Sequence, residues 1–424
     1  MAREMKDSGI EWIGEIPRDW KIEKYKHCFV CSKKIVGNKS NSVQLLSLTT
    51  RGIKKRSKND TFGKVPDSYD TYQVVKQNDI VMCLFDLDVS AVFSGISPYN
   101  GMISPAYKVL NSKENVFPKY ADYWFSYIFD GRKYKYYSKN LRFTLNYDEF
   151  AGLEMLLPSL NEQKCIANYL DTKCAHIDSV IEKTRAAIEE YKKLKQAVIT
   201  QAVTKGIRPN REMKDCGIEW IGETPEEWNI LKIKYLFTIK KDIAGEEGYQ
   251  VLSITQRGIK PKDLSKNEGQ LAANYSNYQI VNIGDFAMNH MDLLTGWVDI
   301  SKYYGVTSPD YRVFRLFDIE NNNSRYYLYL MQLCYFNRVF YGLGQGVSGM
   351  GRWRLQADKF LNMYIVNPPI DEQSEIVAYL DEKTAAIDSL IQKKEQLISE
   401  LEAYKKSLIY EYVTGKKEVP VHAH

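Results

Sequence analysis

Two stretches in the first half of the chain combine basic residues in patterns that suit contacts with DNA. RGIKKRSK, from Arg51, carries five basic residues in eight, and GRKYKYYSKNLRF, from Gly131, interleaves basic side chains with tyrosines. Lysine and arginine neutralise phosphates, arginine reads guanine edges, and polar side chains such as tyrosine bond to the sugar–phosphate backbone. The DNA contacts predicted from these stretches are Arg51, Lys54, Lys55, Arg56, Lys58, Arg132, Lys133, Lys135 and Arg142.

The second half of the chain carries counterparts of both stretches. RGIKPKDLSK begins at Arg257, and GQGVSGMGRWRL presents two arginines after a glycine-rich loop. The predicted contacts here are Arg257, Lys260, Lys262, Lys266, Arg352 and Arg354. A solvated charged face remains the alternative for each single lysine. Base-specific residues are expected in loops that differ between the halves, so the paired arginines are better candidates for phosphate or framework contacts.

No stretch of the chain carries a complete catalytic motif. NPPI, from Asn367, is similar to the Asn-Pro-Pro-aromatic loop of amino-methyltransferases, but Ile370 stands in place of the aromatic residue and no glycine-rich turn follows a strand to hold S-adenosylmethionine. We interpret these prolines as preceding a helix start. GLGQGVSGMG, from Gly342, lacks the Gly-Lys-Ser/Thr of a phosphate loop. Cys28 and Cys31 have no second Cys/His pair nearby to complete a zinc site. We therefore expect a chain without an active site, bound metal or cofactor.

Composition places the chain among soluble globular proteins. Apolar residues make up 44% and charged residues 26% of 424, and the net charge is +5. The N-terminus lacks a signal-peptide pattern and no apolar run reaches bilayer length. We expect a cytoplasmic protein that does not contact membranes.

A tandem repeat of about two hundred residues covers nearly the whole chain. MKDSGIEWIGEIPRDW, from Met5, returns as MKDCGIEWIGETPEEW, from Met213, with twelve of sixteen positions identical. LSLTTRGIK, from Leu46, returns as LSITQRGIK, from Leu252, and the segment from Glu162 returns from Glu372. The offset stays between 204 and 210, which indicates one duplicated unit with small loop insertions and deletions.

Each repeat divides into a globular part and a long helix. The globular part mixes short β-rich runs with aromatic helical stretches, which is typical of a mixed α+β domain. The helix follows a proline, with Ser159 three residues before Glu162 in a capping-box spacing and Asp371 as the cap of the second copy. Apolar residues then recur at spacings of three and four, and they form a heptad seam. Lys195 and Lys405 interrupt this seam at matching positions, where they could snorkel or fix the register.

The predicted architecture is therefore two similar globular domains joined by two long antiparallel coiled-coil helices, with pseudo-two-fold symmetry. The predicted boundaries are 1–158 for the first domain, 159–207 for the first helix, 208–368 for the second domain, 369–416 for the second helix and 417–424 for a tail. Trp12, Trp20, Trp220 and Trp228 are predicted to be packing anchors for the two opening segments.

The order of these parts, with GIEWIGE…P…W opening each half and EQ…YLD…ID opening each helix, resembles the specificity subunit of type I restriction–modification systems. The resemblance spans Met5 to about Gly415. It implies two target-recognition domains that each read half of a bipartite, asymmetric site in double-stranded DNA. It also implies that the helices set the spacer between the half-sites, so that four residues inserted after Thr184 would change the spacer alone.

The resemblance also implies partners. Two methyltransferase subunits dock on the helices, and two restriction–translocase subunits join the assembly; S-adenosylmethionine, ATP and Mg²⁺ are expected on those subunits only. We expect an outward face near each helix start to form part of the methyltransferase dock, through Tyr169, Leu170, Tyr379 and Leu380. Two alternatives stay open: a stand-alone methyltransferase or nuclease, and a coiled-coil scaffold that does not bind DNA.

Overall fold

The computed structural model describes residues 3–60, 66–87, 90, 93–133, 143–265, 274–346 and 353–420. The chain divides into two compact units, residues 1–185 with 395–424 (unit 1) and residues 186–394 (unit 2). Each unit contains the globular part of one repeat, the start of that repeat's long helix and the end of the other long helix. No helix in the described part of the chain is long and apolar enough to span a membrane.

Unit 1 is a mixed α+β globule with two four-stranded sheets, ordered β6-β5-β10-β7 and β4-β11-β8-β9. The pairs β1–β2 and β3–β12 are separate and antiparallel. Its strands are β1 (Met5–Asp7), β2 (Glu15–Pro17), β3 (Lys21–Lys24), β4 (Phe29–Ser32), β5 (Leu45–Thr49), β6 (Gly52–Arg56), β7 (Gln73–Val75), β8 (Ile80–Met82), β9 (Ser94–Ile96), β10 (Gly101–Ile103), β11 (Lys108–Ser112) and β12 (Glu154–Leu157). Its helices are α1 (Tyr25–Cys28), η1 (Gly37–Ser42), α2 (Pro118–Asp130), α3 (Tyr147–Ala151) and the first part of α4 (Leu160–Lys205).

Unit 2 repeats this element order. Its four-stranded sheet, β16-β23-β20-β21, corresponds to β4-β11-β8-β9 of unit 1. Its strands are β13 (Met213–Asp215), β14 (Glu223–Pro225), β15 (Asn229–Lys232), β16 (Phe237–Lys240), β17 (Leu252–Thr255), β18 (Gly258–Pro261), β19 (Gln279–Val281), β20 (Phe286–Met288), β21 (Val298–Ile300), β22 (Gly305–Thr307), β23 (Arg312–Leu316) and β24 (Tyr364–Asn367). Its helices are η3 (Ile233–Tyr235), α5 (Ser324–Phe336), α6 (Val339–Gly342), α7 (Ala357–Asn362) and the first part of α8 (Ile370–Val413). The predicted mixed α+β fold of two similar globular domains with long helices is confirmed.

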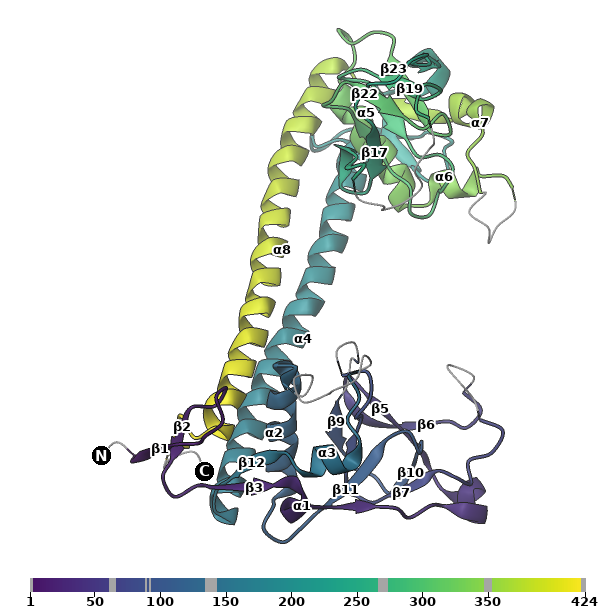
Figure 1. The fold of residues 1–424 in the computed structure, drawn as a ribbon. Coiled ribbons are helices and arrows are strands. Elements are labelled where there is room, and N and C mark those ends of the chain that lie inside the picture. Colours follow the sequence, from purple (N-terminus) through teal and green to yellow (C-terminus); the bar gives the residue numbers. More distant parts are fainter. Residues whose placement is uncertain are drawn as a thin grey trace. The chain divides into compact units, whose positions relative to one another are not determined.

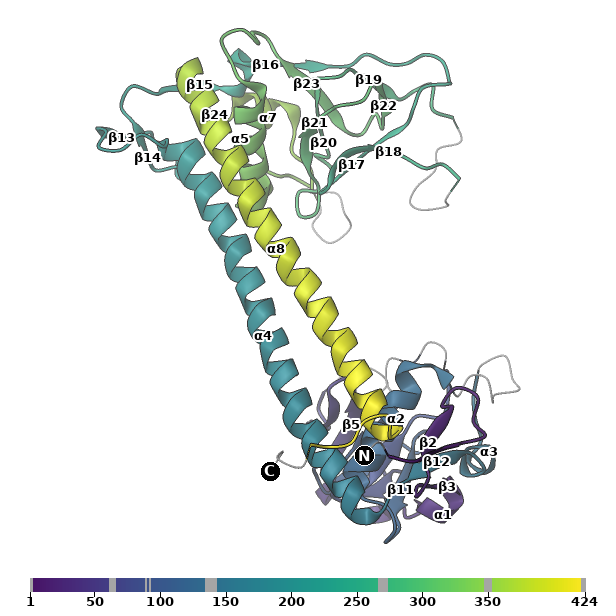
Figure 2. The same ribbon diagram turned by 90° about the vertical axis from the view of Figure 1, so that its left-hand side faces the viewer.

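The two long helices run antiparallel within each unit (Figures 1 and 2). In unit 1, Ile177 and Ile181 of α4 and Leu408 of α8 are buried in one core. Each lysine that interrupts the seam makes an ion pair across it: the Lys405 Nζ lies 2.7 Å from the Asp178 carboxylate in unit 1, and the Lys195 Nζ lies 2.7 Å from the Asp388 carboxylate in unit 2. These pairs fix the register because a one-turn slip would separate both partners.

The start of each long helix is held by polar contacts that the sequence predicted only in part. The Glu162 N–H donates to the Ser159 hydroxyl at 3.2 Å, which confirms that half of the capping box. The expected cap at Asp371 is wrong: α8 begins at Ile370, and the Asp371 carboxylate instead pairs with Arg208 at 3.1 Å. The interpretation of Pro368 and Pro369 as residues preceding a helix start is confirmed.

Candidate nucleic-acid interface

A β-hairpin with a tight turn presents the first predicted DNA contact of each unit. In unit 1 it joins β5 to β6, and the Thr49 hydroxyl donates to the Gly52 carbonyl at 2.7 Å and accepts from the Arg51 N–H at 3.1 Å. Gly52 has φ of 79°, a left-handed conformation that suits glycine. This turn holds the Arg51 side chain exposed at the hairpin tip.

The basic residues that follow Arg51 divide into exposed and tethered side chains. Lys54 and Lys55 are exposed on β6, with the Lys55 Nζ 4.8 Å from the Tyr99 ring centroid. Arg56 pairs with Asp60 at 3.4 Å. The Lys58 Nζ donates to the Ser40 and Asn41 carbonyls at 2.7 Å each, so Lys58 braces η1 in this structure.

The second predicted stretch of unit 1 begins inside the fold. Arg132 has φ of 47° and donates to the Leu87 and Ser90 carbonyls at 3.0 and 2.8 Å. The Lys133 Nζ lies 4.7 Å from the Trp12 ring centroid, and burial lowers the pKa of Lys133. Lys135 and Arg142 lie outside the described residues. Arg132 and Lys133 therefore have packing roles in unit 1, and their contact with DNA stays a prediction.

In unit 2 the hairpin β17–β18 repeats the same turn. The Thr255 hydroxyl donates to the Gly258 carbonyl at 2.9 Å and accepts from the Arg257 N–H at 3.1 Å. Arg257 and Lys260 are exposed and Lys262 is half-buried. Arg354 is exposed, and its backbone pairs with Gln345. Lys266 and Arg352 lie outside the described residues.

An ionic cluster, here called the clasp, ties the opening segment of each unit to its long helix. In unit 1 the clasp consists of Arg3, Asp19 and Glu162, with Arg3 2.9 Å from Asp19 and 2.6 Å from Glu162. In unit 2 it consists of Arg211, Glu227 and Glu372, where the Arg211 guanidinium bonds to both carboxylates. Hydrogen bonding to Glu162 and to Glu372 raises the pKa of Arg3 and of Arg211, respectively.

The clasps differ in burial and in the tryptophan beside them. The Glu372 side chain is 0% exposed and that of Arg211 is 9%, against 25% for Glu162 and 21% for Arg3. The Trp228 Nε1–H donates to the Glu372 carboxylate at 2.9 Å, whereas the buried Trp20 Nε1 has no hydrogen-bond partner among the described residues. Trp20 and Trp228 are 1% and 0% exposed, which confirms them as packing anchors, and Trp12 and Trp220 pack half-buried against the same cores.

The clasp was not predicted from the sequence, although its residues recur in both repeats. Arg3 and Arg211 match at an offset of 208, and Glu162 and Glu372 match at 210. Opposite charges retained at matching positions of two copies indicate a pair, but the separation of about 160 residues along the chain hid it.

The expected outward face near each helix start is wrong for its two leucines. Leu170 and Leu380 are both 0% exposed and belong to the cores of their own units. Tyr169 is half-buried and its ring lies 4.7 Å from that of Tyr412, and Tyr379 is half-buried with the Lys383 Nζ 5.7 Å from its ring. The two tyrosines retain some exposure, and their role in binding a partner stays a prediction.

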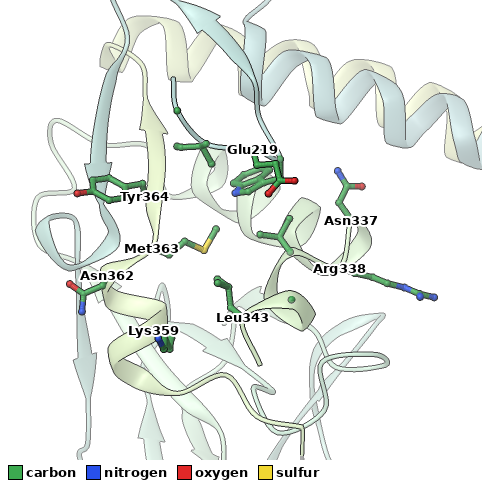
Figure 3. A pocket seen from close by; sticks show the side chains of 13 residues that line it. Glu219, Asn337, Arg338, Leu343, Lys359, Asn362, Met363 and Tyr364 are labelled. Carbon is green, nitrogen blue, oxygen red and sulfur yellow. The ribbon is translucent and has the colours of Figure 1, made fainter. Parts of the chain in front are cut away.

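Unit 2 has a hollow beside Trp220, whose counterpart in unit 1, Trp12, contacts the Lys133 side chain. It measures about 780 Å³ and is lined by Trp220, Leu343 and Met363, among others. Figure 3 shows Met363 and Leu343 facing into the hollow and the Arg338 side chain pointing away from its centre. Val339 lines it at the position equivalent to Lys133, whose Nζ covers Trp12 in unit 1.

A second difference between the units is a pair of basic residues in unit 2, the buried Arg312 and the half-buried His290. Burial and then the Arg312 charge lower the pKa of His290 to about 4, and burial lowers the pKa of Arg312 to about 10. The Arg312 Nη2 donates to the Leu355 carbonyl at 2.8 Å. Within the described residues, no group of three or more His, Cys, Asp or Glu side chains could hold a metal ion.

The chain is similar to known proteins of type I restriction–modification systems. Residues 225–401 match the family model described as the type I restriction modification DNA specificity domain. The chain is 26% identical over 284 residues to the type I restriction enzyme MjaVIII specificity subunit of Methanocaldococcus jannaschii, covering 64% of this chain and 63% of that protein. It is 25% identical over 240 residues to the putative MjaX specificity subunit of the same organism, covering 52% and 53%. The matched region thus spans less than two thirds of either relative.

Solved structures share the fold at low sequence identity. One, described as showing complex assembly and conformational transition of the type I R-M system, has a TM-score of 0.70 and 13% identity, covering 95% of this chain and 99% of that one. The HsdS subunit from Thermoanaerobacter tengcongensis has a TM-score of 0.52 and 14% identity, covering 97% and 100%. These likenesses show that the duplicated α+β globule with a long helix after each copy is a fold shared with those structures. Residues 225–401 thus match a type I restriction modification DNA specificity domain, and the chain as a whole is similar to type I specificity subunits.

Proposed function

We propose that the protein is the DNA-recognition subunit of a type I restriction–modification assembly. In this proposal each unit reads one half of a bipartite, asymmetric duplex site, and the long helices set the spacer between the halves. The observation that carries the proposal is the duplicated hairpin, which presents Arg51 and Arg257 at identical turns beside exposed lysines. The match of residues 225–401 to a DNA specificity domain supports it.

We also propose that the chain has no catalytic role and holds no cofactor. Methyltransferase subunits would carry S-adenosylmethionine, and restriction–translocase subunits would carry ATP and Mg²⁺. The motif that is similar to a methyltransferase loop supports this view, because the Asn367 carboxamide oxygen accepts hydrogen bonds from Tyr327 at 2.5 Å and Gln373 at 3.2 Å. That amide group is engaged in joining β24 to α8 and α5.

A methylation map tests the proposal. The chain is co-expressed with its cognate methyltransferase subunit, that subunit is expressed without the chain, and modified bases are mapped by long-read sequencing. We expect a gapped motif with two different half-sites that appears only when both proteins are present. Methylation that does not depend on this chain, or an identical inverted repeat as the motif, would contradict the proposal.

A further inference from the structure

The nine residues around the tip arginine are closely matched in the two repeats, and they differ at two positions. LSLTTRGIK of unit 1 and LSITQRGIK of unit 2 differ at Leu48 versus Ile254 and at Thr50 versus Gln256. The first difference is buried, with both side chains 8% exposed, and conserves volume. The second is exposed, at the tip, directly before the arginine.

The backbone that presents the tip is the same in both units. Thr49 and Thr255 make equivalent hydrogen bonds within the turn, and Gly52 and Gly258 have φ of 79° and 93°. Strand pairing closes the turn at the Thr49–Gly52 pair and at the Thr255–Gly258 pair. The two hairpins therefore offer a ligand one scaffold with a different side chain at the tip, a hydroxyl with a methyl group in unit 1 and a carboxamide in unit 2.

The carboxamide of Gln256 is available to a ligand. Its Nε2 donates one hydrogen bond, to the Thr295 carbonyl at 3.3 Å, and its Oε1 accepts none within the described residues. Gln256 borders a recess of about 840 Å³ that also has Gln332 and Trp297 in its lining. Thr50 borders the smaller recess of unit 1, about 300 Å³, beside Asp122 and Ser126. Neither tip side chain is packed into a core.

We propose that position 256 reads an A·T base pair in the half-site contacted by unit 2, and that position 50 is the corresponding specificity position of unit 1. A glutamine carboxamide can both donate and accept, and it pairs in bidentate fashion with N7 and the N6 amino group of adenine in the major groove. Threonine lacks this pairing and contacts bases through its hydroxyl or methyl group. Arg51 and Arg257, which are the same in both repeats, anchor each hairpin on the phosphates. This inference rests on the proposed DNA-recognition function.

The experiment exchanges tip residues between the repeats and reads the methylated motif. The full chain, as wild type, Gln256→Thr, Gln256→Ala or Thr50→Gln, is co-expressed with its methyltransferase subunit. Ile254→Leu, which also replaces a unit 2 residue by its unit 1 counterpart, is the matched control in the same hairpin. The fraction of modified sites is measured for each base at each position of the motif.

Both Gln256 variants should lose discrimination at a single A·T position of one half-site. Loss of a bidentate contact worth about 1–3 kcal/mol corresponds to a loss of about 5- to 150-fold in preference for that base. Thr50→Gln should change the other half-site alone, and Ile254→Leu should leave the motif unchanged. An unaltered motif in both Gln256 variants, or relaxation at a G·C position, overturns the inference. A wild-type chain that yields no motif overturns the proposed function itself, so the two failures are distinguishable.

Discussion

Replacing Arg211 by alanine should lower the free energy of unfolding of unit 2 far more than replacing Arg3 by alanine lowers that of unit 1. Arg211 is the guanidinium partner of Glu372, whose side chain is 0% exposed. Removing one partner of a buried pair leaves an uncompensated charge and costs about 3–5 kcal/mol. Glu162, the equivalent carboxylate, is 25% exposed, so water can replace Arg3 and the cost should be about 1 kcal/mol. The Trp228 N–H still donates to Glu372 in the variant, so we expect the lower end of the buried range and a difference of about 2 kcal/mol.

Hydrogen exchange of the full chain measures both costs separately. The peptides that contain Trp228 and Trp20 report on unit 2 and unit 1, and 2 kcal/mol corresponds to a difference of about 30-fold in opening. The control is the double variant Arg211→Ala with Glu372→Gln, which removes both charges and should recover part of the loss. Equal protection losses in the two single variants would refute the reasoning that burial of the carboxylate decides the cost. So would a double variant less stable than Arg211→Ala.

Three further predictions follow from differences between the repeats and from the helix seam. Trp228→Phe should lower the free energy of unfolding by about 1.5–3 kcal/mol more than Trp20→Phe, because only Trp228 donates to a carboxylate. Equal shifts of the urea unfolding midpoint in the two variants would contradict this. His290 occupies the position of Leu84 in unit 1, and its pKa is lowered to about 4. The free energy of unfolding of unit 2 should therefore be at its full value above about pH 6.5 and fall by up to about 3 kcal/mol as the pH drops to 4. His290→Leu should abolish that dependence; an unchanged pH profile of unfolding would show that another group causes it. A variant with seven residues inserted after Arg185 and seven after Lys394 keeps the heptad seam and lengthens each helix by about 10 Å. The spacer of its methylated motif should therefore grow by about three base pairs, with both half-sites unchanged. An unchanged spacer would show that the helices do not set it.

The packed parts of the fold could be predicted well from the sequence, because the two copies of the repeat show which residues are retained. Positions that must pack are retained in both copies, so the buried tryptophans, the long helices and the seam lysines could all be located without coordinates. Lys195 and Lys405 fix the register, which is one of the two roles that the sequence predicts for them. Their partners, Asp388 and Asp178, lie on the neighbouring helix, where the pattern of a single helix cannot show them.

The prediction of outward-facing leucines was wrong because a helical pattern gives the spacing of side chains but does not show which other parts of the fold cover them. Leu170 and Leu380 lie next to tyrosines that are half-exposed, yet each globular core covers its leucine completely. The DNA contacts of Lys58 and Arg132 stay predictions, but the pattern also could not show that Lys58 donates to carbonyls of η1 and Arg132 to the carbonyls of Leu87 and Ser90. Tertiary contacts of this kind depend on loop paths that composition and periodicity do not encode.

Unit 1 is built from two separate segments of the chain, and this affects how the protein folds during synthesis. Leu408, Ile409, Tyr412 and Val413, from the end of α8, belong to the core of unit 1, and the Tyr120 hydroxyl donates to the Val413 carbonyl at 3.3 Å. Unit 2 is one continuous stretch, residues 186–394, whereas unit 1 needs residues from both ends of the chain. At about 5–20 residues per second, the ribosome delivers the end of α8 on the order of tens of seconds after the first globular part has emerged. During that interval the nascent first half carries an uncovered apolar surface, so the earlier-made unit is the later one to be completed and the one that most needs protection from aggregation.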